Sequence, residues 1–272
     1  MKLNDRKFYE QFWAAYSPDL ALQLAVHTES RRPLHRLLER LIPADREAWF
    51  LEVGCGTALD TCLLAQWRPL ASPVAADLSH EAMTIAQRYA AEMGVRLELL
   101  AGDLKSLPFP DAEFDLVFSQ GVLEHFEDPM PCVREQARVL KPGGVLLVDV
   151  PQKYNWYTVM KHRAMREGRW AWGWETEYSA RDLRGWAKHS GLEPIAAVGH
   201  QHGRMLDRLL IHPHRTVRNK LAQRNGHRVA AAYQPGAVAR AWENVWDWVD
   251  AVVGPYTAIN VAVAYRKNEV GR

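Results

Sequence analysis

The chain of 272 residues is 48% hydrophobic, enough to bury a substantial core as one large domain with insertions. Its 34 Lys and Arg residues nearly balance its 32 Asp and Glu residues, so the surface as a whole should not attract nucleic acid. Three cysteines without a Cys-x-x-Cys pair indicate neither a disulfide framework nor a structural zinc site, and we expect no metal. No apolar run is long enough for a secretion signal or a membrane span, which favours a cytoplasmic protein with no membrane span.

Residues 1–43 are expected to form a helical cover, because Pro33 suits a first helical position and leucines from Leu34 to Leu41 recur at helical spacing. From Trp49 onward, short apolar runs alternate with helical stretches, which is typical of βαβ units and a parallel sheet. Ser79 is placed to cap one of these helices, and residues 141–144 are expected to form a turn. The five predicted strands cover residues 49–53, 72–77, 95–103, 114–120 and 143–150.

The composition changes after Pro151 to a Trp-rich insert over residues 152–178, followed by a capping box at Ser179 and Asp182 that opens a helix to about Ser190. Residues 193–200 and 258–265 are predicted to be a sixth and a seventh strand. The expected fold class is α/β, a Rossmann-like doubly wound seven-stranded sheet with a helical N-terminal cover and C-terminal insertions. We expect a core over residues 44–200, a basic, helical insertion over 201–256 that forms part of a substrate lid, and a last core strand and tail over 257–272.

In the stretch FLEVGCGTALD, an apolar strand runs into a turn with Gly54 and Gly56 and then into a helix. Such a turn lets the backbone approach a ligand closely. A nicotinamide-binding fingerprint would need a third glycine where Leu59 stands. The stretch instead resembles the first motif of the class I S-adenosylmethionine-dependent methyltransferases, E-x-G-x-G-x-G, matched by Glu52, Gly54 and Gly56 with Ala58 at the last glycine.

The resemblance extends over about residues 49–151, because FDLVFSQGVLEHFEDP and VLKPGGVLLVDVP are similar to the fourth and fifth strand regions of the type 11 methyltransferase subgroup. It implies S-adenosylmethionine as the cofactor, with Asp77 holding both ribose hydroxyls and Asp103 meeting the adenine amino group beside the Leu104 amide. Ser79 and Met83 would line the adenine side. The full set of expected cofactor residues is Glu52, Gly54, Cys55, Gly56, Ala58, Asp77, Leu78, Ser79, Met83, Gly102, Asp103, Leu104, Ser119, Gln120 and Gly121.

A general base is needed only if the acceptor must lose a proton, and the candidates are His125, Tyr154 and His162, in falling order. In the family the loop that carries His125 faces the methyl group, so the imidazole serves either as the base or as a structural support of the loop. Glu52 and Asp103 have a simpler reading as cap or surface acids. Cys55 is expected to be a small filler of the turn, because no base is placed for thiol chemistry.

Eight of the 11 Trp residues follow residue 151, where acceptor specificity is expected. Trp170, Trp172 and Trp174 alternate, so in an extended segment they share one face and either roof a pocket or pack the insert onto the sheet. The aromatic residues between Phe8 and Tyr16 resemble the family's N-terminal cover over the cofactor. The expected acceptor contacts are Trp13, Tyr16, His125, Tyr154, Trp156 and Trp174.

The leading hypothesis is therefore methyl transfer to a small-molecule acceptor. We expect no nucleic acid as a partner and consider a homodimer as the assembly. One alternative is an RNA or protein methyltransferase that docks its substrate on the basic stretch 201–228, which is otherwise a solvated helix face. The others are a catalytically silent partner that only binds S-adenosylmethionine, and an NAD-linked oxidoreductase, which Leu59 disfavours. The pair His212 and His214 is weak support for a metal.

Overall fold

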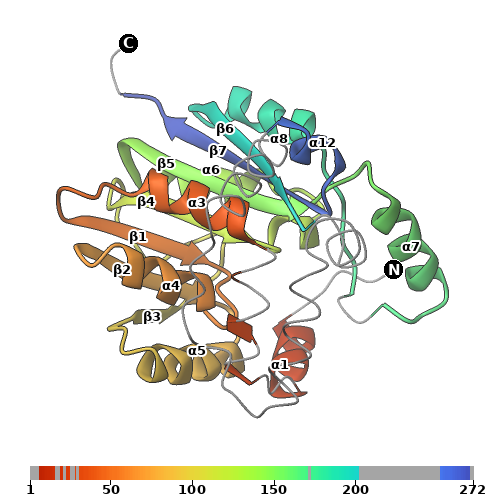
Figure 1. Ribbon diagram of the computed structural model, residues 1–272, viewed down its shortest axis with the longest axis horizontal. Coiled ribbons are helices and arrows are strands. Elements are labelled where there is room, and N and C mark those ends of the chain that lie inside the picture. Colours follow the sequence, from red (N-terminus) through yellow and green to blue (C-terminus); the bar gives the residue numbers. More distant parts are fainter. Residues whose placement is uncertain are drawn as a thin grey trace, which may run out of the picture.

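A computed structural model of the chain describes residues 6–15, 19–20, 23–24, 28, 31–170, 173–201 and 252–269. Its centre is a seven-stranded sheet in the order β3-β2-β1-β4-β5-β7-β6, which confirms the predicted fold class (Figure 1). The strands are β1 (Ala48–Val53), β2 (Ala71–Asp77), β3 (Glu98–Ala101), β4 (Phe114–Gln120), β5 (Leu140–Pro151), β6 (Leu192–His200) and β7 (Asn260–Lys267).

The first five strands run parallel, and β7 is antiparallel to both β5 and β6. The chain therefore starts in the middle of the sheet at β1, builds outward to β3, and then crosses to β4 on the other side. Between β1 and β4 the strand order reverses. Ligands of doubly wound folds bind outside the carboxyl ends of the strands at such a point.

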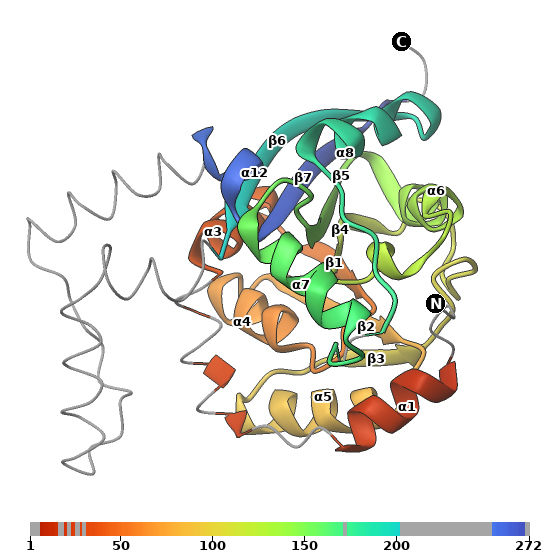
Figure 2. The ribbon, with the colours of Figure 1, turned by 90° about the vertical axis from the view of Figure 1, so that its right-hand side faces the viewer.

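Helices cover both faces of the sheet, which is why its central strands are apolar on both sides (Figure 2). One face carries α3 (Arg32–Leu41), α4 (Leu59–Trp67) and α5 (His80–Glu92), and the predicted leucines of α3 are buried there against β1 and β4. The other face carries α6 (Met130–Val139) and α8 (Ala180–Trp186). The largest apolar cluster of the described residues lies beneath α6 and α8.

Two predicted helix starts are confirmed by their hydrogen bonds. The Ser79 side chain accepts a bond from the backbone N–H of Ala82 at the start of α5. The capping box of Ser179 and Asp182 is present at the start of α8, which ends at Trp186 and continues as a short 3-10 helix, η2 (Ala187–His189).

The predicted turn over residues 141–144 is wrong. These residues lie inside β5, which starts at Leu140 and pairs with β4 on both sides of a register shift between Phe114 and Leu116. Gly143 adopts a φ of 76°, so the Pro-Gly-Gly sequence produces an irregularity within the strand rather than its beginning.

The remaining described elements lie around the carboxyl edge of the sheet. They are α1 (Arg6–Ala15), η1 (Leu123–His125), α7 (Trp156–Arg166) and α12 (Gly254–Thr257). Among the described residues, no helix has the length and apolar character needed to cross a bilayer.

Candidate active site

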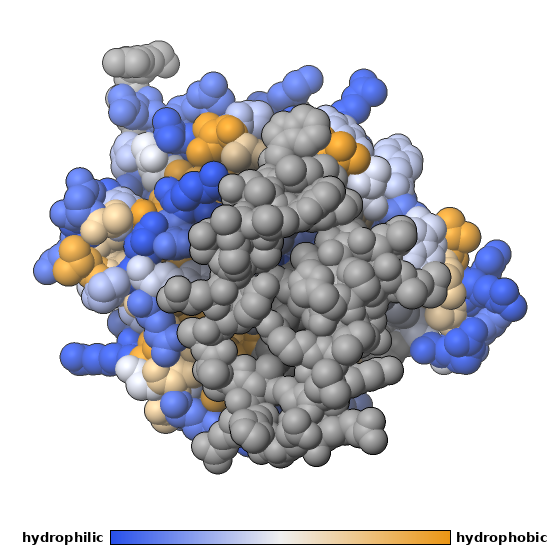
Figure 3. All heavy atoms as spheres, in the orientation of Figure 1, coloured by the Kyte–Doolittle hydropathy of each residue, from blue (hydrophilic) through white to orange (hydrophobic). Residues whose placement is uncertain are grey.

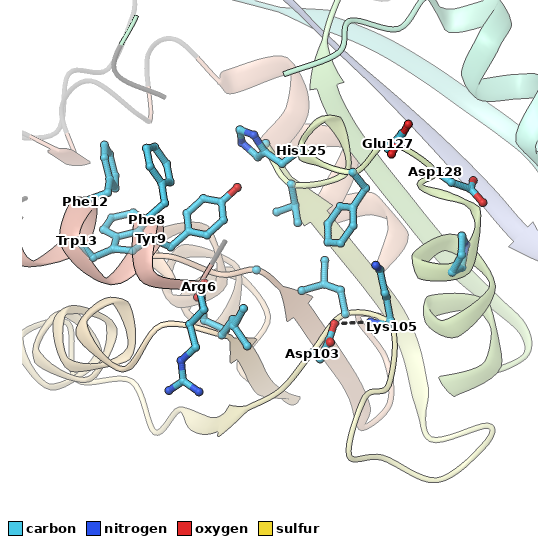
Figure 4. A pocket seen from close by; sticks show the side chains of 18 residues that line it. Arg6, Phe8, Tyr9, Phe12, Trp13, Asp103, Lys105, His125, Glu127 and Asp128 are labelled. Atoms are coloured by element: carbon cyan, nitrogen blue, oxygen red, sulfur yellow. Dashed lines mark hydrogen bonds between the residues drawn. The ribbon is translucent and has the colours of Figure 1, made fainter. Parts of the chain in front are cut away.

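A pocket of about 630 Å³ lies at the carboxyl edge of the sheet, enclosed on one side by α1 and on the other by the turns that follow β1, β2, β3 and β4 (Figure 4). The segments that meet there are far apart in the sequence. Its lining residues are Arg6, Phe8, Tyr9, Phe12, Trp13, Gly54, Asp77, Leu78, Asp103, Leu104, Lys105, Gly121, Val122, His125, Phe126, Glu127, Asp128 and Pro131.

The turn after β1 brings the backbone to the pocket wall. Gly54 has a φ of 68°, and a Cβ on it would lie 2.6 Å from a methyl carbon of Val122. Gly56 has a φ of 52°, and a Cβ there would lie 2.8 Å from the Trp13 ring. Both positions therefore need glycine for conformation and for space.

Ala58, where the resembled motif has its last glycine, also adopts the left-handed conformation, with a φ of 49°. This conformation costs an alanine about 1 kcal/mol. The Ala58 methyl group is fully buried against Ala75 and Ala86, and burial of a methyl group returns a free energy of similar size, about 0.8 kcal/mol. The chain therefore keeps the glycine-type turn without a glycine.

Asp77, at the end of β2, presents a carboxylate held by two backbone donors. The N–H of Gly56 donates to Oδ2 at 2.8 Å, and the N–H of Ser79 donates to Oδ1 at 2.9 Å. Burial raises the pKa of Asp77, and the backbone hydrogen bonds oppose this rise. Each oxygen retains a lone pair for a further donor such as a ligand hydroxyl.

The other expected cofactor residues fall into two groups. Leu78, Asp103, Leu104 and Gly121 join Gly54 and Asp77 in the pocket lining. The remaining expected residues do not line it: Cys55, Gly56, Ala58, Ser79, Met83, Gly102, Ser119 and Gln120. Burial raises the pKa of the Cys55 thiol well above its usual value, so this thiol is a poor nucleophile.

Glu52 is buried near the end of β1, two residues before Gly54, and does not line the pocket. It accepts hydrogen bonds from Thr61 Oγ1 at 2.5 Å and from Gln120 Nε2 at 3.2 Å. Burial, together with the nearby Asp60 carboxylate, raises the pKa of Glu52 to about 8. Glu52 and its hydrogen-bond partners therefore support the buried side of the glycine turn and do not form the pocket wall.

Sequence reasoning missed the rest of this network. Asp60 accepts hydrogen bonds from Arg31 at 2.7 Å, from Gln120 at 3.1 Å, and pairs with His35 Nε2 at 2.6 Å. These groups connect the N-terminal part of the chain, through the start of α4, to the end of β4. An acid one residue inside a helix carries no signal of such a role, because ordinary helices also begin with acids.

The wall opposite the strand ends comes from α1, which contributes Phe8, Tyr9, Phe12 and Trp13 (Figure 4). Glu10 on the same helix, which sequence reasoning also missed, attaches α1 to the core. Its carboxylate accepts hydrogen bonds from Ser79 Oγ at 3.0 Å and from the His80 N–H at 3.2 Å, at the N-terminus of α5. Burial raises the pKa of Glu10, but the hydrogen bonds lower it by more, so the net pKa of this carboxyl lies below its usual value.

His125 lines the pocket with its ring oriented by the Trp-rich insert. Its Nδ1 lies 2.8 Å from the carbonyl oxygen of Trp174, and a carbonyl only accepts, so Nδ1 carries a proton. In the neutral ring, Nε2 then holds the lone pair. Burial lowers the pKa of His125, and the Trp174 carbonyl opposes this effect, so the neutral form is favoured. The ring of Tyr9 meets that of His125 edge-on, with centroids 5.8 Å apart.

The other two base candidates do not line the pocket. Tyr154 is 66% exposed, and Lys153 Nζ lies 5.8 Å from the centre of its ring. His162 is half-exposed and its Nε2 lies 3.0 Å from the Glu177 carboxylate.

Of the expected acceptor contacts, Trp13 and His125 line the pocket. Trp174 does not line it, but its backbone carbonyl accepts a hydrogen bond from His125. Trp156 is on the outer face of α7. Tyr16, Trp172 and the basic stretch beyond Gln201, with its His212–His214 pair, lie outside the described residues. In the part of the chain that the structure describes, no three His, Cys, Asp or Glu side chains are grouped to hold a metal ion.

Residues 51–148 match the family model of a methyltransferase domain. The chain is similar to a trans-aconitate 2-methyltransferase of Azoarcus sp., 34% identical over 145 residues, which are 53% of this chain and about half, 54%, of that protein. It is also similar to a malonyl-[acyl-carrier protein] O-methyltransferase of Herminiimonas arsenicoxydans, 29% identical over 76% of this chain and 74% of that protein.

Solved structures show the same fold. A possible histamine N-methyltransferase from Thermotoga maritima superposes with a TM-score of 0.58 at 16% identity, over 96% of this chain and 99% of that one. The geranyl diphosphate C-methyltransferase of Streptomyces coelicolor, solved with S-adenosyl-L-homocysteine, gives a TM-score of 0.56 at 13% identity over 87% of this chain and 79% of that one.

Proposed function

We propose that the chain is a class I S-adenosylmethionine-dependent methyltransferase that transfers the methyl group of this cofactor to a small-molecule acceptor, and its match to a methyltransferase domain over residues 51–148 supports this. The observation that carries the proposal is the pocket itself. Its cavity of about 630 Å³ is walled by aromatic side chains and enclosed between α1 and the strand ends, a size typical of sites for small ligands.

The residues at the strand ends fit the cofactor. We assign the ribose to Asp77, whose two carboxylate oxygens each keep a lone pair, and the adenine to Asp103 and the Leu104 amide at the neighbouring strand end. Gly54 lines the pocket without a side chain, so we assign the remainder of the cofactor to the space along its backbone. The cofactor supplies a methyl group already activated by a sulfonium.

The chain's own contribution is alignment, exclusion of water and, where required, removal of a proton. The aromatic wall of α1 keeps water from the reacting centre and offers ring faces to a cationic group. We assign the base to His125, because its neutral ring presents the Nε2 lone pair and its depressed pKa keeps it unprotonated at neutral pH. An acceptor hydroxyl or protonated amine would pass its proton to this nitrogen.

The relatives guide the choice of acceptors. Their names specify trans-aconitate, O-methylation of malonyl-[acyl-carrier protein] and in ubiquinone biosynthesis, and N-methylation of dimethylglycine, so carboxylic acids, hydroxyl compounds and small amines are the classes to test. A cytoplasmic location completes the proposal, and the three free, buried cysteines are in keeping with a reducing compartment.

The test is to incubate the purified protein with S-adenosylmethionine and each acceptor class, and to measure S-adenosylhomocysteine release together with the mass of the acceptor. We expect a gain of one methyl group on a small molecule and no reaction with tRNA or protein mixtures. Transfer only to tRNA or protein would favour the macromolecular alternative. Cofactor binding without transfer to any acceptor would favour a catalytically silent partner protein.

A further inference from the structure

Helix α7 exposes large apolar side chains to solvent and buries two polar ones. Its Thr158 and Lys161 are buried, whereas Trp156, Val159 and Met160 are 49%, 70% and 59% exposed. The exposed three stand at i, i+3 and i+4, so they form one continuous apolar stripe. A helix on the surface of a globular protein normally turns its apolar stripe toward the core.

Specific bonds fix this orientation. The Lys161 ammonium group is 2.9 Å from the Glu175 carboxylate and 2.5 Å from that of Glu177. Burial lowers the pKa of Lys161, but the two carboxylates raise it more, so the amine stays charged and paired. On the same face, Thr158 Oγ1 donates to the carbonyl of Gln152 at 2.8 Å. The two buried side chains of α7 are therefore polar and its partly buried ones, Tyr157, Ala164 and Met165, are apolar, while the stripe of Trp156, Val159 and Met160 points outward.

The apolar stripe has a basic rim. Lys153, Arg163, Arg166 and Arg169 are exposed around it. Glu167 is the single acid between residues 153 and 169 and pairs with both Arg163 and Arg169, so the rim keeps a net positive charge. Tyr154 adds a further exposed aromatic ring at the start of the helix. At the edge of the molecule where Figure 1 places α7, Figure 3 shows apolar and strongly hydrophilic side chains next to one another.

We propose that this face of α7, formed by Tyr154, Trp156, Val159 and Met160 with its basic rim, docks on an anionic lipid bilayer. The apolar stripe enters the boundary between headgroups and acyl chains, Trp and Tyr rings favour that boundary, and the rim attracts anionic headgroups. A second copy of the chain fits less well, because a symmetric contact would bring the two basic rims together. The near-neutral net charge of the whole chain does not oppose this local attraction.

Docking through α7 would turn the active site toward the bilayer. The helix follows β5 directly at the carboxyl edge of the sheet, where the pocket also lies. Figure 2 shows α7 and α1, which forms one wall of the pocket, on the same side of the molecule.

The test is co-sedimentation of the full chain with vesicles, without cofactor or acceptor, so its result is independent of the methyltransferase proposal. We expect binding to phosphatidylcholine vesicles that contain phosphatidylglycerol, weaker binding as salt rises, and little binding to pure phosphatidylcholine. The triple variant Trp156→Ser, Val159→Ser, Met160→Ser should bind the anionic vesicles about tenfold or more weakly. The double variant Leu70→Ser, Ile195→Ser, which removes exposed apolar side chains distant from α7 in the sequence, should bind like the wild type.

Circular dichroism and the melting temperature establish that each variant is folded. Wild-type protein that stays in the supernatant with anionic vesicles at low salt would overturn the proposal, as would a folded triple variant that binds as tightly as the wild type. Sedimentation equilibrium of the same samples identifies the competing occupant. If the wild type self-associates without binding vesicles and the triple variant does not self-associate, the face belongs to a second copy of the chain. If neither vesicle binding nor self-association is observed, a protein partner is the remaining occupant.

Discussion

At the scale of single residues, His125 is the position where structure and chemistry are most closely linked. Its ring is oriented by the Trp174 carbonyl, and burial keeps its pKa below the ordinary value. Protonation at low pH would remove the Nε2 lone pair. The rate of transfer to an acceptor that must lose a proton should therefore fall as the pH drops through this depressed pKa, and level off above it.

Replacing His125 with Asn should lower this rate by about a hundredfold and abolish the acidic limb of the profile. Because the side chain is assigned to the acceptor, calorimetric affinity for S-adenosylhomocysteine should change little. Rates across the pH range, with cofactor affinity measured in parallel, check both points. A variant with the wild-type rate and an unchanged pH profile would return His125 to a structural role in its loop.

Single residues also differ in how well the sequence predicted their surroundings. Asp77 and Asp103 line the pocket, and the sequence indicated this position because each is the last residue of a predicted strand and the carboxyl ends of parallel strands share one edge. Glu10 and Arg31 could not be placed. Their partners, Ser79 and Asp60, are 69 and 29 residues away, and no local pattern encodes such a contact.

At the scale of elements, α1 is attached to the core by the packing of Trp13 on α4 and α5 and by a polar contact to a helix end. The Glu10 carboxylate accepts bonds at the N-terminus of α5, where backbone N–H groups have no partner within the helix. Since α1 forms one wall of the pocket, its attachment should control how fast a bound cofactor leaves.

Glu10→Ala should weaken this attachment by about 0.5 to 1 kcal/mol, and release of S-adenosylhomocysteine should become about two- to fivefold faster in stopped-flow measurements. Glu92→Ala, which removes an exposed acid at the other end of α5, is the matched control and should leave the rate unchanged. Equal release rates in wild type and Glu10→Ala would show that α1 does not limit exit.

Strand and helix positions were largely predictable because their signals are local: β4 has its predicted bounds, and both helix caps form as expected. The error at residues 141–144 has a physical cause. Pro-Gly-Gly favours a turn, but pairing on both sides of the irregularity extends β5 through it. The outward position of the apolar stripe on α7 was not predictable either. It depends on the ion pairs of Lys161 with Glu175 and Glu177, which lie beyond the following loop.

At the scale of the whole molecule, the sheet order places the reversal between β1 and β4 beneath the pocket, so the turn of Gly54 and the loop of Gly121 form adjacent walls. The alternation of strands and helices predicted this arrangement. The closing of the pocket by α1 was expected only from resemblance, since aromatic residues at a chain's start have no defined position in a fold.

The central claim is that the ends of the first three strands form one cradle for an adenosyl group, with the Asp77 carboxylate at its centre. Calorimetric titration with S-adenosylhomocysteine tests it most directly. We predict saturable binding by the wild type, a loss of about 1 to 3 kcal/mol in a folded Asp77→Ala variant, and wild-type affinity in the exposed control Asp45→Ala. No heat of binding at millimolar ligand, or unchanged affinity in Asp77→Ala, would contradict the account.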